Sequence, residues 1–344
     1  MSCSLLVLLM LTFMSVSAFN LKGPKLFSLY KRLFTIQSTS YKHPRNKHQN
    51  RYDIDSLVES LPQLLKCVIK SPSGEKTIDM SNQESVRLLN SALLLKYYNI
   101  KDWKFSYEFL TPPIPSRVEY VHYLADVIGY DYFTKNKNIS GMDIGCGSSC
   151  IYPLLFNAEY KIKMVGVDID NNSLLNAKKI LQSNNLCDSI DLRLQPTPAD
   201  IYNHHVIKNN EKFLFSMCNP PFYDSIDDAE RASERKWKNL GKGNKKSSRQ
   251  FGGTSNELVY PGGDQGFVSK MIQQSLNYKN QILYFSALVS QEKHMSKLCQ
   301  ALEAIRANGV YVEFSTIEFN PGQKKSRILV WSFVENKAVW LNQL

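Results

Sequence analysis

The chain has 344 residues, of which 43% are hydrophobic and 11% aromatic. This length and composition are ordinary for a globular protein with a sizeable core, and they allow one large α/β domain with additions or two small domains. The formal net charge of +11 is uneven: residues 1–52 hold eight Lys or Arg and no acid, whereas residues 53–344 hold 34 bases and 31 acids. The body of the protein is therefore not generally basic, and contact with a polyanion must come from local patches.

The cysteine and histidine spacing argues against a metal site. Seven cysteines are spread along the chain without a CxxC pair, and Cys146 and Cys150 have no histidine near them in the sequence. We therefore expect no metal, isolated buried thiols and a reducing compartment. Among the six histidines, we expect His122 to pack within a helix and the other five to lie at the surface.

The first 42 residues have the composition of a targeting presequence. A short apolar run from Leu5 to Met14 precedes Ser-Val-Ser-Ala, which is typical of a signal peptide cleaved before Phe19. Residues 19–42 are basic, hydroxylated and free of acids, as transit peptides are. A signal-like segment at 1–18 and a transit-like segment at 19–42 favour a plastid over a mitochondrial address; a start codon assigned too far upstream is the alternative. The run is shorter than the roughly 20 residues of a membrane span, so we expect no stable membrane insertion of the mature protein.

Residues 43–130 are predicted to form a helical N-terminal module. Apolar residues recur at three- and four-residue steps from Ile54 to Leu65 and from Val86 to Leu94. Ser81 or Asn82 is suited to cap the second helix. A proline-stiffened loop and a further helical pattern complete the module, which we expect to contribute to RNA binding.

From residue 138 onward, strand patterns alternate with helical patterns. This alternation is typical of an α/β fold with a doubly wound, mostly parallel sheet, which we assign to residues 131–344 with a basic loop at 223–266. The last two strands are separated by the short segment NPGQKKSR, which predicts a hairpin and therefore one antiparallel strand. The predicted strands are 139–144, 164–170, 190–195, 213–219, 281–289, 311–319 and 327–334.

A glycine turn after the first of these strands predicts a nucleoside site. In the sequence Asp143-Ile144-Gly145-Cys146-Gly147, the glycines allow a tight turn and close approach of a ligand to the backbone. Asp168 ends the next strand, where an acid can bind the ribose hydroxyls. A dinucleotide-binding GxGxxG turn would have glycine where Cys150 stands, so the pattern favours S-adenosylmethionine (SAM). We expect Asp143, Gly145, Gly147 and Asp168 to bind this cofactor.

The sequence Asn219-Pro220-Pro221-Phe222 follows a strand at the edge where open α/β sheets place ligand groups. The amino group of adenine is a poor nucleophile, because its lone pair is delocalised into the ring. The side-chain carbonyl of Asn219 and the backbone carbonyl of Pro220 can accept hydrogen bonds from its two N–H groups. They can also accommodate the charge that develops on methyl transfer. The prolines pre-position these acceptors, and Phe222 offers a face for a flipped base. We expect all four residues to be catalytic, with Asn219 also near the cofactor.

Two basic segments are candidates for RNA contact. Residues 43–51 contain no acid, and residues 231–249 contain eight bases, one acid and an aromatic ring. Bases interleaved with an aromatic residue suit phosphate contact and base stacking, although many charge runs are only solvated surface. The predicted RNA-binding residues are Arg45, Lys47, Arg51, Arg235, Lys236, Trp237 and Lys238.

The chain resembles the F-type family of ribosomal RNA large subunit methyltransferases and, more loosely, the methyltransferase-like 16 family that modifies U6 small nuclear RNA and messenger hairpins. The resemblance covers residues 43–334. Its main blocks are HPRNKHQNRYD at 43–53, PPIPSRVEYVHYLAD at 112–126, DIGCGSSCIYPLL at 143–155, CNPPFYDS at 218–225, SERKWKNLG at 233–241, FGG at 251–253 and GQKKSRILVWSF at 322–333.

This resemblance implies a class I (Rossmann-like) SAM-dependent methyltransferase that methylates N6 of an adenine in 23S-type rRNA. It assigns the cofactor carboxylate to Arg117 and further cofactor contacts to Gly145, Asp168 and Asn219. The looser family has Glu where this chain has Asp168, a conservative departure. Bacterial F-type members are cytoplasmic and begin at the HPRN block, so residues 1–42 are an addition.

Other functions remain open at this level. An adenine in U6-type or another structured RNA is an alternative substrate. A protein glutamine amide presents the same problem of a weak nucleophile, although such enzymes usually have Tyr where this chain has Phe222. An inactive RNA-binding factor is a third alternative. The target adenine, naked rRNA or an assembly intermediate as substrate, and the oligomeric state are not indicated by the sequence.

Overall fold

A computed structural model describes residues 35–37, 42–135, 139–197, 199–239, 253–320 and 325–343. The chain divides into two units, residues 1–37 and 38–344. In the first, the described part is strand β1 (Thr35–Gln37), and the remainder of the predicted presequence up to residue 41 lies outside the described residues. Within the described ranges, no helix is long and apolar enough to span a membrane.

The N-terminal helices are stabilised by a small core of their own. The side chains of Leu57, Leu64 and Leu93 are buried together there. Asn82 caps the long helix by accepting a hydrogen bond from the backbone N–H of Ser85, as the sequence predicted. The elements of this region are α3 (Ile54–Ser60), η1 (Pro62–Cys67), β2 (Val68–Lys70), β3 (Lys76–Ile78) and α4 (Gln83–Tyr98).

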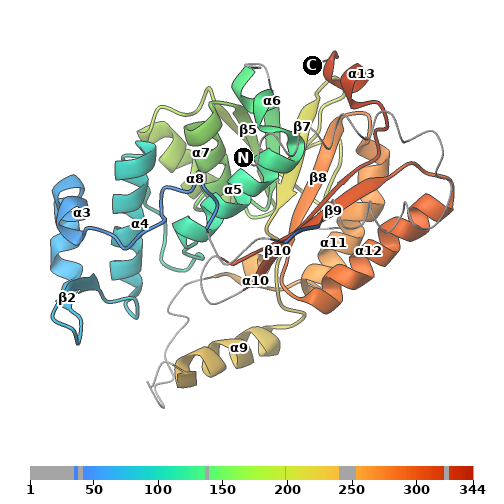
Figure 1. Ribbon diagram of the computed structural model, residues 1–344. Coiled ribbons are helices and arrows are strands. Elements are labelled where there is room, and N and C mark those ends of the chain that lie inside the picture. The colour runs from blue at the N-terminus through green and yellow to red at the C-terminus, as the bar shows by residue number, and fades with distance from the viewer. Residues whose placement is uncertain are drawn as a thin grey trace, which may run out of the picture. The chain divides into compact units, whose positions relative to one another are not determined.

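The larger part of the second unit alternates strands and helices as predicted (Figure 1). Its helices are α5 (Ile114–Ile128), α6 (Tyr130–Lys135), α7 (Ile151–Tyr160), α8 (Asn171–Ser183), α9 (Ile226–Asn239), α10 (Ser255–Leu258), α11 (Gly263–Ser275), η2 (Leu276–Tyr278), α12 (Glu292–Ala307) and α13 (Lys337–Leu341). Its strands are β4 (Ser140–Ile144), β5 (Lys163–Asp168), β6 (Ile190–Leu194), β7 (Phe213–Cys218), β8 (Ile282–Val289), β9 (Glu313–Phe319) and β10 (Ser326–Ser332).

The sheet of this unit has the order β9-β10-β8-β7-β4-β5-β6. Strands β4 to β8 pair in parallel, whereas β10 runs antiparallel to both β8 and β9. The predicted terminal hairpin is therefore confirmed, and its second strand is inserted between β8 and β9. This mixed, mostly parallel topology confirms the predicted doubly wound α/β fold.

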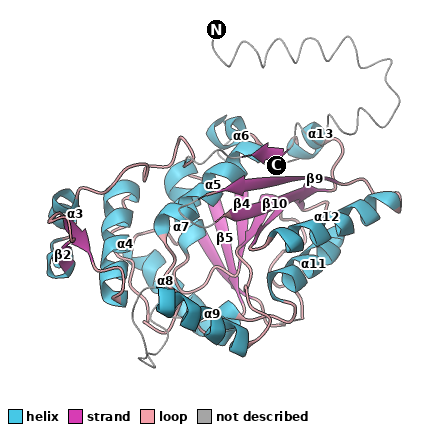
Figure 2. Cartoon of the chain, turned by 60° about the horizontal axis from the view of Figure 1, so that its bottom comes forward, coloured by secondary structure: helices cyan, strands magenta, loops and turns pink. Residues whose placement is uncertain are grey.

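Helices cover both faces of the sheet (Figure 2). One face is packed by residues such as Val118 of α5, Leu155 of α7 and Ile180 of α8. The other face is packed by Met271 of α11 and Leu298 of α12. Leu94 and Tyr98 of α4 belong to the same apolar cluster as α5 and α7, so this cluster joins the N-terminal helical region to the sheet. The domain boundary at residue 130 stays a prediction.

Candidate active site

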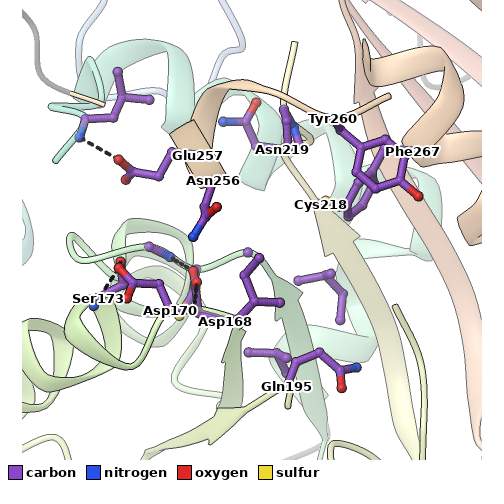
Figure 3. Close-up of a pocket in the computed structure, with 18 of the residues that line it drawn as sticks. Asp168, Asp170, Ser173, Gln195, Cys218, Asn219, Asn256, Glu257, Tyr260 and Phe267 are labelled. Carbon is purple, nitrogen blue, oxygen red and sulfur yellow. Dashed lines mark hydrogen bonds between the residues drawn. The ribbon is translucent and has the colours of Figure 1, made fainter. Parts of the chain in front are cut away.

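A cavity of about 480 Å³ opens where β4, β5 and β7 end. Its wall is built from segments that are far apart in the sequence: the glycine turn, the end of β5, the start of the NPPF loop and residues 254–261. Figure 3 shows that Asp168, Asn219 and Asn256 lie around the same space. This is the carboxyl edge of the parallel strands, where α/β folds bind ligands.

The glycine turn brings the backbone directly to this cavity. Gly145 and Gly147 have φ angles of 76° and 62°, in the left-handed region that glycine adopts without strain. The backbone N–H groups of Gly145 and Cys146 donate to the carbonyl of Val167 at 2.8 and 2.9 Å, which fixes the turn against β5. Both glycines line the cavity, and their contact with a cofactor stays a prediction.

Asp168 lies at the end of β5 and lines the cavity. Its Oδ2 accepts the backbone N–H of Gly147 at 2.8 Å, and its Oδ1 accepts that of Asp170 at 2.9 Å. Burial raises the pKa of Asp168 to about 6, against the lowering effect of these N–H donors. A carboxylate held this rigidly can accept hydroxyl donors from a ligand.

Asp143 differs from the other predicted cofactor residues because it does not line the cavity. Neither of its carboxylate oxygens has a hydrogen-bond partner among the described residues. Burial raises the pKa of Asp143 well above its usual range; the charge of Asp168 adds to this, and Arg117 opposes it. A direct cofactor contact for Asp143 stays a prediction.

Arg117 extends from α5 into the cavity lining, close to the Tyr152 ring, whose centroid is 5.6 Å from the guanidinium carbon. Within the described part of the chain, the buried Nε of Arg117 has no hydrogen-bond partner. Buried polar atoms without protein partners are costly, and they are expected where a polar ligand supplies the missing bonds. The donor at Arg117 fits a carboxylate, as the family resemblance implied.

The NPPF loop starts directly after β7. The side-chain Oδ1 of Asn219 is buried and has no hydrogen-bond partner in the described ranges, while Asn219 and Pro221 line the cavity. Pro220 is buried, and Phe222 is half-buried without being part of the cavity wall. The next residue, Tyr223, is bonded to the segment after the basic loop, with its N–H donating to Leu258 at 3.0 Å. Asn219 is thus an available acceptor, and stacking on Phe222 stays a prediction.

Several cavity residues were missed by the sequence analysis. Gln195 follows β6, and the segment from Thr254 to Tyr260 forms the wall near Asn219 (Figure 3). Glu257 belongs to this segment and forms a capping box with Thr254. The Thr-x-x-Glu spacing is a recognised helix-start signature and could have predicted the short helix, but not its position beside the glycine turn.

The HPRN block is folded into the protein. His43 Nε2 lies 2.8 Å from Asp126 Oδ2, and Arg45 pairs with the same carboxylate at 2.5 Å. Lys47 pairs with Glu159 at 2.8 Å. The expectation of a surface position is wrong for His43 and His48, which are 2% and 0% exposed, because partners distant in the sequence enclose them.

The remaining predicted RNA contacts are exposed or lie on α9. Arg51 is exposed and pairs with Glu75. Arg235, Lys236, Trp237 and Lys238 belong to α9, whose backbone is described as helix up to Asn239, while residues 240–252 and the side chains from 233 onward lie outside the described parts. Among the described residues, no group of three His, Cys, Asp or Glu could hold a metal ion.

Comparison with known proteins identifies the family. A family model described as RNA methyltransferase matches residues 36–335. The chain belongs to this RNA methyltransferase family. It is 41% identical over 302 residues to ribosomal RNA large subunit methyltransferase F of Pseudomonas putida (strain GB-1), covering 86% of this chain and 94% of the relative. The protein of the same name from Flavobacterium johnsoniae is 39% identical over 301 residues, covering 86% of this chain and 94% of the relative.

Solved structures similar to this RNA methyltransferase confirm the class I, Rossmann-like fold. The catalytic domain of human METTL16, solved with a hairpin of the MAT2A 3′UTR, superposes with a TM-score of 0.71 at 27% identity, covering 86% of this chain and 96% of that one. The N-terminal domain of human METTL16 in complex with SAH (S-adenosylhomocysteine) gives a TM-score of 0.66 at 26% identity, covering 86% and 100%. Both family resemblances drawn from the sequence are thereby confirmed.

Proposed function

We propose that this RNA methyltransferase transfers a methyl group from SAM to N6 of an adenine in large-subunit, 23S-type rRNA. The observation that carries the proposal is the buried, unpartnered Oδ1 of Asn219 in the described structure, at the edge of the cavity that Asp168 and the glycine turn also line. An acceptor fixed at this place suits an amine that must lose its planarity. The rRNA substrate is supported by the names of the bacterial relatives, which are about 40% identical.

The residues of the cavity fit the cofactor. The guanidinium of Arg117 would hold its carboxylate, Asp168 would accept its ribose hydroxyls, and the turn at Gly145 and Gly147 would let the nucleoside approach the backbone. When bound, the cofactor supplies an electrophilic methyl group on a positively charged sulfur. Neither a metal nor a covalent enzyme intermediate is needed for this transfer.

On the substrate side, the protein's task is to hold the amine in line with the methyl group. The Oδ1 of Asn219 and the carbonyl of Pro220 would accept hydrogen bonds from the two N–H groups of the amine. These bonds favour a pyramidal nitrogen and stabilise its developing charge. Pro220 and Pro221 stiffen the loop, so that little reorganisation is needed at the moment of reaction. Phe222 would stack on the flipped base.

We further propose that α9 and the basic segment after it contact RNA phosphates, while Arg45 and Lys47 serve the fold through their ion pairs. Residues 1–42 would act as an organellar address, with a plastid favoured by their signal-like and transit-like composition.

A substrate panel tests the proposed function. The full chain without residues 1–42 is incubated with labelled SAM and one of three acceptors: a large-subunit rRNA, a U6-type hairpin, or a protein carrying an accessible glutamine. We expect label in the rRNA at a single N6-methyladenosine, mapped by digestion and mass spectrometry, and at least about tenfold less in the other two. The U6-type hairpin is the strongest alternative substrate, because the similar METTL16 catalytic domain was solved with a bound RNA hairpin. Preferential labelling of that hairpin or of glutamine would contradict the proposal.

A further inference from the structure

Glu257 occupies a position in the cavity wall that its capping role does not explain. One of its oxygens, Oε2, accepts the backbone N–H of Thr254 at 2.9 Å and that of Leu110 at 3.2 Å. This oxygen therefore ties the start of α10 to the loop before α5. The other oxygen, Oε1, lies 3.5 Å from the point that a Cβ on Gly147 would occupy, so it faces the glycine turn.

Asp168 approaches the same glycine from β5. Its Oδ2 accepts the backbone N–H of Gly147 at 2.8 Å, so the carboxylates of Asp168 and Glu257 both border Gly147. Both residues line the cavity (Figure 3). Burial raises the pKa of Glu257, and the charge of Asp168 raises it further. Two partly buried acids beside one turn are unfavourable unless a ligand brings donors to them.

We propose that Glu257 accepts a hydrogen bond from a ribose hydroxyl of the cofactor, so that the two hydroxyls of the sugar are shared between Asp168 and Glu257. The inference deepens the proposed function, on which it rests for the identity of the cofactor. A ribose supplies two adjacent O–H donors, which match acceptors on two sides of one turn. An O–H donor to a carboxylate also makes a stronger hydrogen bond than a neutral pair does.

This contact would join the cofactor to the catalytic loop. Residues 258–260 follow Glu257 directly and pair with Tyr223, the residue after Phe222: Tyr223 donates to Leu258, and Tyr260 donates back to Tyr223, both at 3.0 Å. A sugar held by Glu257 therefore restrains the segment that holds the NPPF loop in place.

The test measures cofactor binding without RNA. Dissociation constants are determined by calorimetry for SAH and for its 2′-deoxy and 3′-deoxy analogues, with the wild-type chain and with Glu257→Gln. The amide oxygen of Gln can still accept from Thr254 and Leu110, so this variant retains the tie but loses the acceptor that faces Gly147. Glu108→Gln is the matched control, because Glu108 is an exposed glutamate of the loop that contains Leu110, and its side chain does not line the cavity.

We expect Glu257→Gln to weaken SAH binding about tenfold, as for the loss of one charge-assisted hydrogen bond. In the variant, deleting one of the two hydroxyls should cost less than about twofold, whereas in the wild type and in Glu108→Gln each deletion should cost about tenfold. If removing either hydroxyl still weakens binding to Glu257→Gln about tenfold, the inference is overturned and Glu257 is only a structural tie. A wild-type chain that does not bind SAH at all would refute the proposed function as well.

Discussion

Helix α5 contributes to two polar clusters of opposite character. In the first cluster, Glu119 accepts the backbone N–H of His43 at 2.9 and 3.0 Å and the side-chain amide of Asn46. In the same cluster, Asp126 is paired with His43 and Arg45. Single nitrogens of Arg45 and His122 lack partners in the described structure, but both carboxylates are fully engaged. The carboxylates of this cluster therefore need no ligand.

The cluster at the cavity is incomplete. Arg117 comes from the same helix and lines the cavity, and its Nε has no partner within the described residues. The same holds for Oδ1 of Asn219 and for both oxygens of Asp143, which is buried but does not line the cavity. An unsatisfied buried polar atom costs about 1–3 kcal/mol, so several in one place are retained only where function compensates. Both clusters are charged and polar. Within the described residues, the side-chain oxygens of Asn219 and Asp143 lack partners, whereas those of Glu119 and Asp126 have them.

Two asparagines allow the sharpest test of this contrast, and the larger effect is expected at Asn219. Asn219→Ala should lower the rate of methyl transfer by about 1000-fold, the usual effect of removing a key acceptor or donor in a preorganised site. The free energy of unfolding should be unchanged or slightly higher, since the buried Oδ1 of Asn219 accepts no hydrogen bond from the described residues. Single-turnover rates with saturating SAM and urea unfolding measure the two quantities. Turnover within about tenfold of wild type would refute the catalytic role of Asn219.

Asn46 should behave in the opposite way. Its Nδ2 donates to the carbonyl of Pro115 at 3.1 Å and to Glu119, and its Oδ1 accepts the N–H of His48 at 2.9 Å. Asn46→Ala leaves Glu119 buried with fewer donors, so we expect the free energy of unfolding to fall by about 2 kcal/mol. The SAH dissociation constant, measured on the folded variant at low temperature, should change less than about threefold. Unchanged stability would contradict the contrast between the clusters.

The contrast also explains what the sequence could predict. The glycine turn, Asp168 and the NPPF loop each follow a buried strand, and parallel strands bring their carboxyl ends to one edge, so the cavity follows from local patterns. The partners of the HPRN block do not follow from local sequence patterns. Glu119 and Asp126 are more than 70 residues away from it in the sequence, and no local pattern shows that they neutralise a basic run.

The burial of the histidines and the position of Glu257 could not be predicted from the sequence, for the same reason. His48 is enclosed by α4, where its Nε2 lies 2.8 Å from the Tyr98 hydroxyl, and burial lowers the pKa of His48 to about 4. Glu257 reaches Gly147 only because the segment after α9 pairs with Tyr223. Both depend on long-range packing that periodicity does not encode.

The smallest expected effect concerns the basic residues, and it extends the contrast to the RNA-binding surface. The triple variant Arg235→Ala, Lys236→Ala, Lys238→Ala removes three charges from α9. If these residues contact phosphates, the slope of log affinity against log salt for rRNA should fall by about 2, since each contact contributes roughly 0.7–0.9. Filter binding from low to moderate salt measures this slope.

A second triple variant removes the same net charge from residues that already have partners. Lys66, Lys76 and Lys104 pair with Glu84, Asp55 and Asp102 in the N-terminal part of the described chain. Their replacement by Ala should change the slope by less than about 1, because exposed ion-paired charges release few counterions. Equal changes in both variants would mean that RNA responds to overall charge, and that the bases of α9 have no special part in RNA binding. A larger change in the α9 variant alone would show that the bases of α9, and not overall charge, contact RNA.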